Sequence, residues 1–167
     1  LADAIIAATI VGMAPTDAAP RGCTSFKLRQ LTRRVSRLYD QELAHAGLKT
    51  SQYSLLSHVL RLGPIRPGDL AEAMTMDAST LTRNLRPLLD AGWLVMGPGD
   101  DGRSRLVHIT EAGRAKRSEA QRHWKAAQQQ LNQALGLDTV LALHALLDES
   151  LQRLAAPDDE PDPIDDA

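Results

Sequence analysis

The chain of 167 residues contains a single cysteine, Cys23, and few aromatic residues, which make up 3% of the sequence. One cysteine excludes an intrachain disulfide framework and any zinc site built from several cysteines. The scarcity of aromatic residues, beside abundant leucine and alanine, favours helices over a β-sandwich. No apolar run approaches the roughly 20 residues that cross a bilayer, and no basic residue precedes the longest candidate, 4–14, as a signal peptide requires. The sequence therefore predicts a soluble cytoplasmic protein without membrane association.

Signatures of catalysis and of metal binding are also missing. The chain has no G-x-S-x-G motif, no phosphate-binding glycine loop and no H-E-x-x-H motif. The histidines are scattered, and none pairs with another at the i, i+4 spacing of a helical metal site. They are His45, His58, His108, His123 and His144. We therefore expect a protein that is not an enzyme and that has neither a cofactor nor a metal site.

Charge is distributed unevenly along the chain. The formal net charge is −2, but residues 157–167 hold six acidic residues and no basic one. Fifteen of the 19 basic residues are arginine, whose guanidinium group forms forked contacts with phosphate and guanine. A basic body with an acidic terminus is typical of nucleic-acid-binding proteins, and a solvated charged face with a flexible tail fits the charge equally well.

Periodicity and turn residues predict a mainly α fold with a small β component. Apolar stripes, caps and breakers place helices at 24–46, 51–62, 70–74, 78–90, 111–135 and 139–154, with Thr50, Asp77, Thr110 and Asp138 as N-caps. Runs 93–96 and 105–109 read as a β-hairpin around the turn cluster 97–102, and a short strand is expected before the third helix. Two helices joined by a tight turn and followed by a hairpin form a winged helix-turn-helix.

The domain organisation follows from this order. We expect an arm at 1–22, a winged-helix domain at 23–156 and an acidic, disordered tail at 157–167. Within the domain, a DNA-binding lobe would occupy about 50–110. The helices at about 24–46 and 111–154 exceed what one core of this size needs, so their apolar stripes predict a homodimer.

The helix at 78–90 has the character of a DNA reader. At 100° per residue, three leucines (Leu81, Leu85 and Leu88) gather on one side. Hydroxyl and guanidinium groups, from Ser79, Thr82, Arg83 and Arg86, gather on the other. Arginine binds guanine through two hydrogen bonds, and serine or threonine binds bases or phosphates. Pro87 interrupts the hydrogen bonding of this helix after the reading residues.

The hairpin tip suits the minor groove. Arg103 and Arg105 follow Gly102, and a Gly-rich tip with two arginines can enter a narrow, electronegative groove. Phosphate repels Asp101, whose better role is an ion pair that aims Arg103.

The stretches MDASTLTRNLRPLLDAGWL (76–94) and DGRSRLVHITEAG (101–113) resemble the MarR family of winged-helix regulators. AGLKTSQYSLL (46–56) and DLAEAM (69–74) also fit, and the resemblance covers roughly residues 24–154. It rests on Ser79, Thr80, Thr82 and Arg83 in the recognition helix, Asp101 and Arg103 in the wing, and Ile109, Thr110 and Gly113 after it.

The resemblance implies an obligate homodimer whose terminal helices form the dimer and whose two winged lobes bind a palindromic operator in double-stranded DNA. Most members repress neighbouring genes and release DNA when a small, often aromatic or phenolic, effector binds between the two parts. Tyr39, Tyr53, His58 and Trp124 are the candidates to line such an effector pocket, or else they fill the core. Two alternatives stay open: a winged-helix protein-interaction module without DNA binding, and a redox-sensing regulator that uses Cys23.

Overall fold

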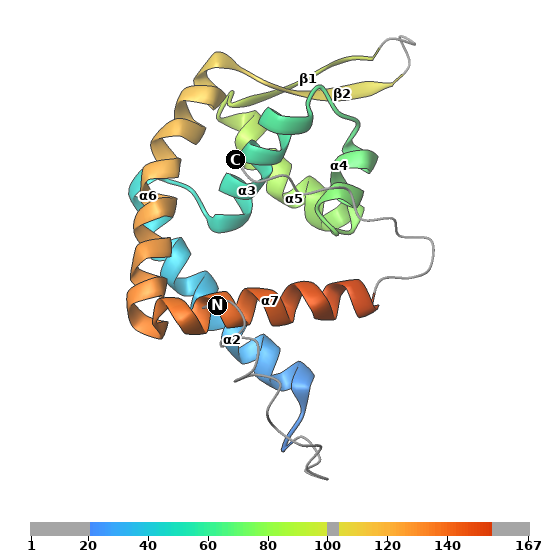
Figure 1. Cartoon of the computed structure of the whole chain (residues 1–167). Coiled ribbons are helices and arrows are strands. Elements are labelled where there is room, and N and C mark those ends of the chain that lie inside the picture. Colours follow the sequence, from blue (N-terminus) through green and yellow to red (C-terminus); the bar gives the residue numbers. More distant parts are fainter. Residues whose placement is uncertain (1–20, 100–103, 155–167) are drawn as a thin grey trace, which may run out of the picture. The chain divides into compact units, whose positions relative to one another are not determined.

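The computed structural model describes residues 21–99 and 104–154 (Figure 1). The chain divides into two compact units between Arg34 and Val35, inside helix α2 (Thr24–Leu43). The described part of the first unit, residues 21–34, contains the first turns of α2, where Phe26 and Leu28 are exposed. The predicted acidic tail and nearly all of the predicted arm lie outside the described residues.

The second unit is a winged helix-turn-helix lobe followed by two long helices. After α2 it contains η1 (Ala44–Ala46), α3 (Thr50–Leu62), α4 (Pro67–Ala73), α5 (Ala78–Asp90), β1 (Leu94–Pro98), β2 (Arg105–Ile109), α6 (Glu111–Leu135) and α7 (Leu137–Leu154). The two strands form one antiparallel sheet. The predicted fold class, mainly helical with a β-hairpin wing, is confirmed. No helix in the two described ranges has the length and apolarity to cross a membrane.

The core lies between the helices of the lobe and the hairpin. The leucine face of α5 is buried as predicted, with Leu81 2%, Leu85 6% and Leu88 0% exposed. It packs in one cluster with residues of α3, α4 and both strands. The other fully buried large side chains of the core are Leu43, Leu55, Leu56, Val59, Leu70, Leu94 and Val107. Burial of this leucine face orients the opposite face of α5 outward.

A backbone bridge joins the hairpin to the segment before α4. Ile65 N–H donates to the Val107 carbonyl at 3.3 Å, and Val107 N–H donates to the Ile65 carbonyl at 2.8 Å. The short strand expected before α4 is thus one residue long. Strand β1 continues beyond the predicted end at 96, because Gly97 and Pro98 pair with Leu106 and Arg105.

Three predicted helix starts are wrong by one to three residues. Helix α4 begins at Pro67, which has no N–H to leave unsatisfied at a first helical position. Thr50 is the first residue of α3 and not its cap; its amide and hydroxyl donate to Asp40 Oδ1 at 2.8 and 2.7 Å. Helix α7 begins at Leu137, before Asp138, because the Gly136 carbonyl already accepts Val140 N–H at 3.1 Å. The predicted first helix also ends as 3₁₀ helix over η1.

Thr110 and Gly113 fix the start of α6 at the base of the hairpin. Thr110 caps the helix as predicted, since its Oγ1 accepts Gly113 N–H at 3.0 Å while its hydroxyl donates to the Gly92 carbonyl at 2.8 Å. Gly113 faces the backbone of Trp93 so closely that a Cβ atom would stand 2.0 Å from the Trp93 carbonyl oxygen. The Thr-x-x-Gly pattern therefore anchors the long helix to the wing.

Candidate nucleic-acid interface

Helix α5 begins at a well-formed cap. Asp77 accepts Thr80 N–H at 2.8 Å and the hydroxyls of Ser79 and Thr80 at 2.6 and 2.7 Å. These hydrogen bonds, the Ser79 hydroxyl first, hold the pKa of Asp77 far below its ordinary value. The turn before the cap is tight, because Met76 N–H donates to the Ala71 carbonyl at 2.8 Å and Thr75 adopts a positive φ of 50°. The start of α5 is therefore held rigidly after α4.

The outward face of α5 carries the predicted reading residues. Ser79, Thr82, Arg83 and Arg86 are exposed, and Thr80 is half-buried. The Thr82 hydroxyl donates to the Ala78 carbonyl at 2.7 Å, and Arg83 donates to the carbonyl and hydroxyl oxygens of Ser79, both at 3.2 Å.

Both arginines of α5 are held by weak interactions. The two Ser79 oxygens that Arg83 meets carry no net charge. The Arg86 guanidinium meets the Asp90 carboxylate at 3.8 Å, with both side chains more than two-thirds exposed. Exposed pairs of this kind are worth little. Both guanidinium groups can therefore turn toward an incoming anion at small cost.

Asn84 is a positioning residue that the sequence pattern did not reveal. Its Oδ1 accepts the Ser51 hydroxyl of α3 at 2.8 Å, and its Nδ2 donates to the Thr80 carbonyl at 2.9 Å. This half-buried amide ties α5 to the first turn of α3. Periodicity offered no signal for it, because an asparagine at the edge of an apolar face reads as a surface residue.

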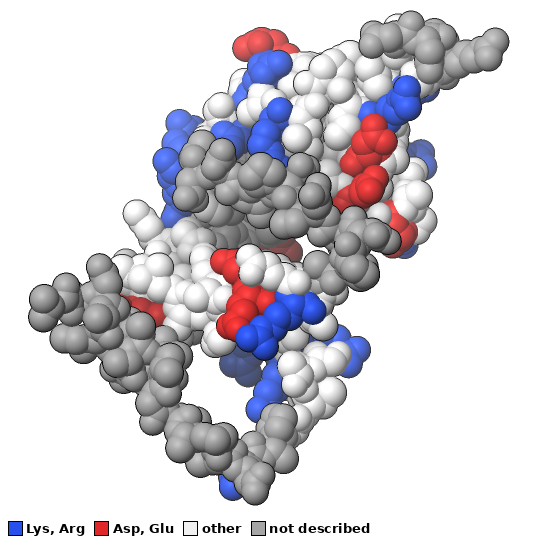
Figure 2. Space-filling model, turned by 45° about the vertical axis from the view of Figure 1, so that its right-hand side comes forward, with Lys and Arg blue, Asp and Glu red and all other residues white. Residues whose placement is uncertain are grey.

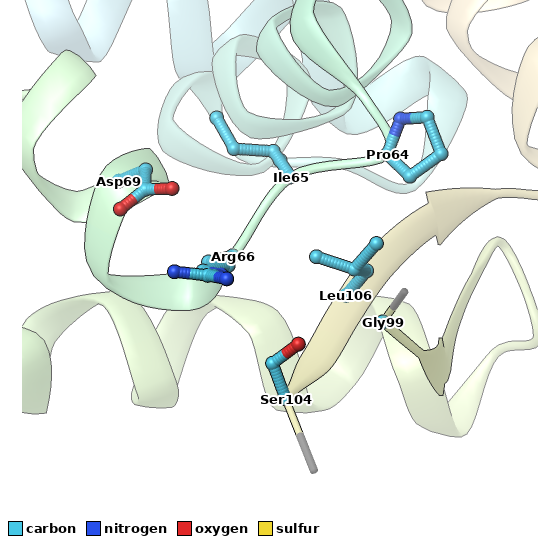
Figure 3. A pocket seen from close by; sticks show the side chains of 7 residues that line it. All are labelled: Pro64, Ile65, Arg66, Asp69, Gly99, Ser104 and Leu106. Atoms are coloured by element: carbon cyan, nitrogen blue, oxygen red, sulfur yellow. The ribbon is translucent and has the colours of Figure 1, made fainter. Parts of the chain in front are cut away.

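The wing is only partly described. Arg105 is exposed on β2, opposite Pro98. Asp101, Arg103 and their predicted ion pair lie outside the described residues. Toward the loop end of the hairpin, a pocket of about 330 Å³ is formed by the α3–α4 link, the first turn of α4, strand β2 and the residues next to the loop ends of both strands (Figure 3). It is lined by Pro64, Ile65, Arg66, Asp69, Gly99, Ser104 and Leu106.

A second pocket, of about 340 Å³, lies beside the reading face. Thr82 and Arg86 form part of its rim, and Leu85, Leu89 and Met96 supply apolar surface. Pro67 and Asp90 complete the lining. The reading face therefore borders a hollow between α5, the start of α4 and β1.

Three of the four predicted effector residues come together. Tyr39 of α2, Tyr53 of α3 and Trp124 of α6 form a ring cluster, with the Trp124 centroid 6.2 Å from Tyr39 and 6.3 Å from Tyr53. The Tyr39 hydroxyl donates to Gln128 Oε1, and burial raises the pKa of Tyr39. His58 Nδ1 instead meets the Ser54 carbonyl of its own helix at 2.8 Å. Both tyrosines are 8% exposed, so the rings pack against one another.

Charge alone does not mark the interface. Figure 2 shows basic and acidic side chains interspersed on the face drawn. The geometry of α5 is therefore the more specific feature. Cys23 is a free, exposed thiol just before α2.

Comparison with known proteins agrees with this architecture. The family model described as "MarR family" matches residues 48–103. The multiple antibiotic resistance protein MarR of Salmonella typhimurium is 30% identical over 123 residues, which cover 72% of this chain and 85% of that protein. The chain belongs to the MarR family. It is therefore a transcriptional regulator, as predicted, and not an enzyme.

Solved structures of other regulators share the fold. A probable transcriptional regulator from Pseudomonas aeruginosa has a TM-score of 0.70 at 27% identity, over 75% of this chain and 95% of that one. A cysteine-to-serine variant of Escherichia coli MarR, crystallised with operator DNA, has a TM-score of 0.70 at 25% identity. This match covers 76% of this chain and 92% of that one.

Proposed function

We propose that this MarR-family regulator is a homodimeric repressor that binds a palindromic operator through α5 and the wing. The observation that carries the proposal is the two-sided character of α5. Its leucines are buried, while Ser79, Thr82, Arg83 and Arg86 face outward from a capped and anchored helix. The structure of a related MarR with operator DNA supports the same use of the fold.

Each of the predicted DNA-contacting side chains of α5 has a role in this proposal. Arg83 and Arg86 bind base edges, with guanine O6 and N7 as preferred acceptors. The hydroxyls of Ser79, Thr80 and Thr82 contact phosphates or bases near the start of the helix. In the wing, Arg103 and Arg105 enter the minor groove, with Asp101 orienting Arg103.

The proposed domain boundaries separate the DNA-binding lobe from the helices that form the dimer. The lobe at about 50–110 binds DNA, the helices at about 24–46 and 111–154 form the dimer, and residues 1–22 and 157–167 are appendages. Support for the dimer comes from α7, whose apolar stripe is buried at Val140 but 69% exposed at Leu151 and 83% exposed at Leu154. A second copy of this helix would cover these leucines. Two lobes would then meet successive major grooves about 34–36 Å apart.

Replacing Arg83 by alanine should weaken operator binding by about 10- to 100-fold, equivalent to roughly 1–3 kcal/mol, and relax base preference at one position. Arg86→Ala should act similarly. Arg83→Lys keeps the charge but loses the forked donor, so it should lose base preference while retaining most non-specific affinity. Fluorescence anisotropy with operator and scrambled duplexes measures both quantities.

The matched control is Arg122→Ala, which removes one exposed guanidinium from α6. It should change affinity only slightly. If Arg83→Ala and Arg83→Lys both bind operator like the unaltered protein, this side chain does not read DNA.

Release by a small aromatic effector is proposed at the cluster of Tyr39, Tyr53 and Trp124. The Arg117 guanidinium lies 5.8 Å from the Tyr53 ring centre, and a cation beside an aromatic cluster is a combination that suits an aromatic acid. In a Trp93→Phe background, phenols or aromatic acids should quench Trp124 fluorescence and weaken operator binding over the same concentrations. Quenching that survives Tyr53→Ala unchanged would place the effector elsewhere.

A further inference from the structure

Two histidines that are 78 positions apart in the sequence meet on the surface of the second unit. His45 lies in η1 and His123 lies in α6, with ring centroids 5.6 Å apart and ring planes at 31°. His45 is exposed and His123 is half-buried, so the pair is accessible from solvent. No spacing in the sequence indicated this pair.

The backbone holds His45 in place against α6. Gly47 adopts a left-handed conformation, so that its N–H donates to the Ala44 carbonyl at 2.9 Å and Leu48 N–H donates to the Leu43 carbonyl at 3.1 Å. From α6, Lys116 Nζ donates to the Ala46 carbonyl at 3.2 Å. Ala46 itself is 2% exposed. Both imidazoles are therefore attached to backbone segments of fixed position. Only rotation about the side-chain bonds can change how the two rings lie relative to each other.

The spacing of the rings suits a shared metal ion. With zinc–nitrogen bonds of about 2.0–2.1 Å and a near-tetrahedral angle, two imidazoles on one ion have ring centres roughly 5 Å apart. The observed 5.6 Å differs from this by an amount that small side-chain rotations absorb. Imidazole is a preferred ligand of zinc, copper and nickel.

The charges around the pair are mixed. Glu119, one turn before His123 on α6, bonds Lys116 Nζ at 2.8 Å. The hydrogen bond and charge of Lys116 hold the pKa of Glu119 below its ordinary value, with smaller contributions from Arg122 and His123. The carboxylate attracts a cation toward His123, whereas Lys116 and Arg122 oppose it. A metal at this site would be held chiefly by the imidazoles.

We propose that His45 and His123 form a binding site for a divalent transition-metal ion of the zinc class, with water in the remaining coordination positions. The described residues contain no set of three histidine, cysteine, aspartate or glutamate side chains arranged for a metal. The site therefore binds reversibly and more weakly than a four-ligand structural zinc site. A bound ion would connect η1, which precedes the proposed DNA-binding lobe, to α6, which follows it.

Zinc titration of the full, tag-free chain tests the proposal by isothermal calorimetry in a buffer that does not chelate metals. One ion should bind per chain, and the melting temperature should rise with the logarithm of the free zinc concentration above the Kd. His45→Ala and His123→Ala should each weaken binding about tenfold or more, because either change leaves one imidazole. Glu119→Gln should weaken it only severalfold. The imidazole resonances of His45 and His123 should shift before those of the other histidines.

Three controls make the outcome decisive. His144→Ala removes an exposed histidine of α7, and Cys23→Ser removes the exposed thiol; both should leave zinc affinity unchanged. The double variant His45→Ala/His123→Ala should keep its zinc-free melting temperature and lose the response to zinc. The proposal is overturned if the unaltered chain binds no zinc at millimolar concentrations, if the double variant retains the site, or if Cys23→Ser abolishes it. None of these readouts depends on DNA binding.

Discussion

Replacing Gly113 by alanine should destabilise the protein by about 3 kcal/mol or more, a loss of roughly 10 °C in melting temperature. An alanine Cβ would stand 2.0 Å from the Trp93 carbonyl oxygen and 2.9 Å from Ile109 Cγ1. The nearest obstacle is backbone, which cannot rotate away as a side chain can. The first turn of α6 would have to lift from the base of the hairpin and lengthen the hydrogen bond from Gly113 N–H to Thr110. Thermal unfolding followed by circular dichroism measures the loss.

Gly68→Ala is the matched control. Gly68 lies in α4, and a Cβ there would meet nothing within 4 Å. Because alanine favours helices by up to about 1 kcal/mol over glycine, this change should be neutral or stabilising. If Gly113→Ala unfolds at the same temperature as Gly68→Ala, the close packing of α6 on Trp93 is not a determinant of the fold.

Replacing Leu151 by aspartate should convert the proposed dimer into monomers at micromolar concentration. Leu151 is 69% exposed in the protomer, so the change should leave the lobe folded, whereas a carboxylate buried in a dimer interface is costly. A single lobe loses the second half-site, and operator affinity should fall by about 10²–10⁴-fold. Sedimentation equilibrium gives the oligomeric state, and anisotropy titration gives the affinity.

Ala145→Asp places the same charge on an exposed position of α7 outside the leucine stripe. It should leave more of the dimer intact than Leu151→Asp does. A Leu151→Asp variant that sediments as a dimer and binds operator normally would show that α7 does not form the interface.

Local signals in the sequence were sufficient to predict most of the helices and strands of the fold. The leucine spacing of α5 identified its buried face, and Asp77 and Thr110 identified the starts of α5 and α6. Both cap through hydrogen bonds to residues three positions away, so the sequence itself contains both partners. The tight turn before α5 and the hairpin after it were recognisable for the same reason.

Features set by contacts between distant segments were not predictable. Thr50 resembled a cap, but its hydroxyl bonds Asp40 of the preceding helix. The Asn84–Ser51 bond and the His45–His123 pair join positions 33 and 78 residues apart. Gly97 and Pro98 resembled turn residues, yet pairing across the hairpin draws both into β1. In each case a contact outside the local segment decided the observed structure.

Helix α5 is proposed to lie in the major groove of an operator. Because guanine N7 faces that groove, protection of N7 from methylation reports directly on this placement. With the unaltered protein, protected guanines should fall in two groups about 10–10.5 base pairs apart, or a multiple of this. Arg83→Ala should lose protection at one guanine in each group while leaving the rest. Operator binding without any protected N7, or protection unchanged in both Arg83→Ala and Arg86→Ala, would show that α5 does not read the major groove.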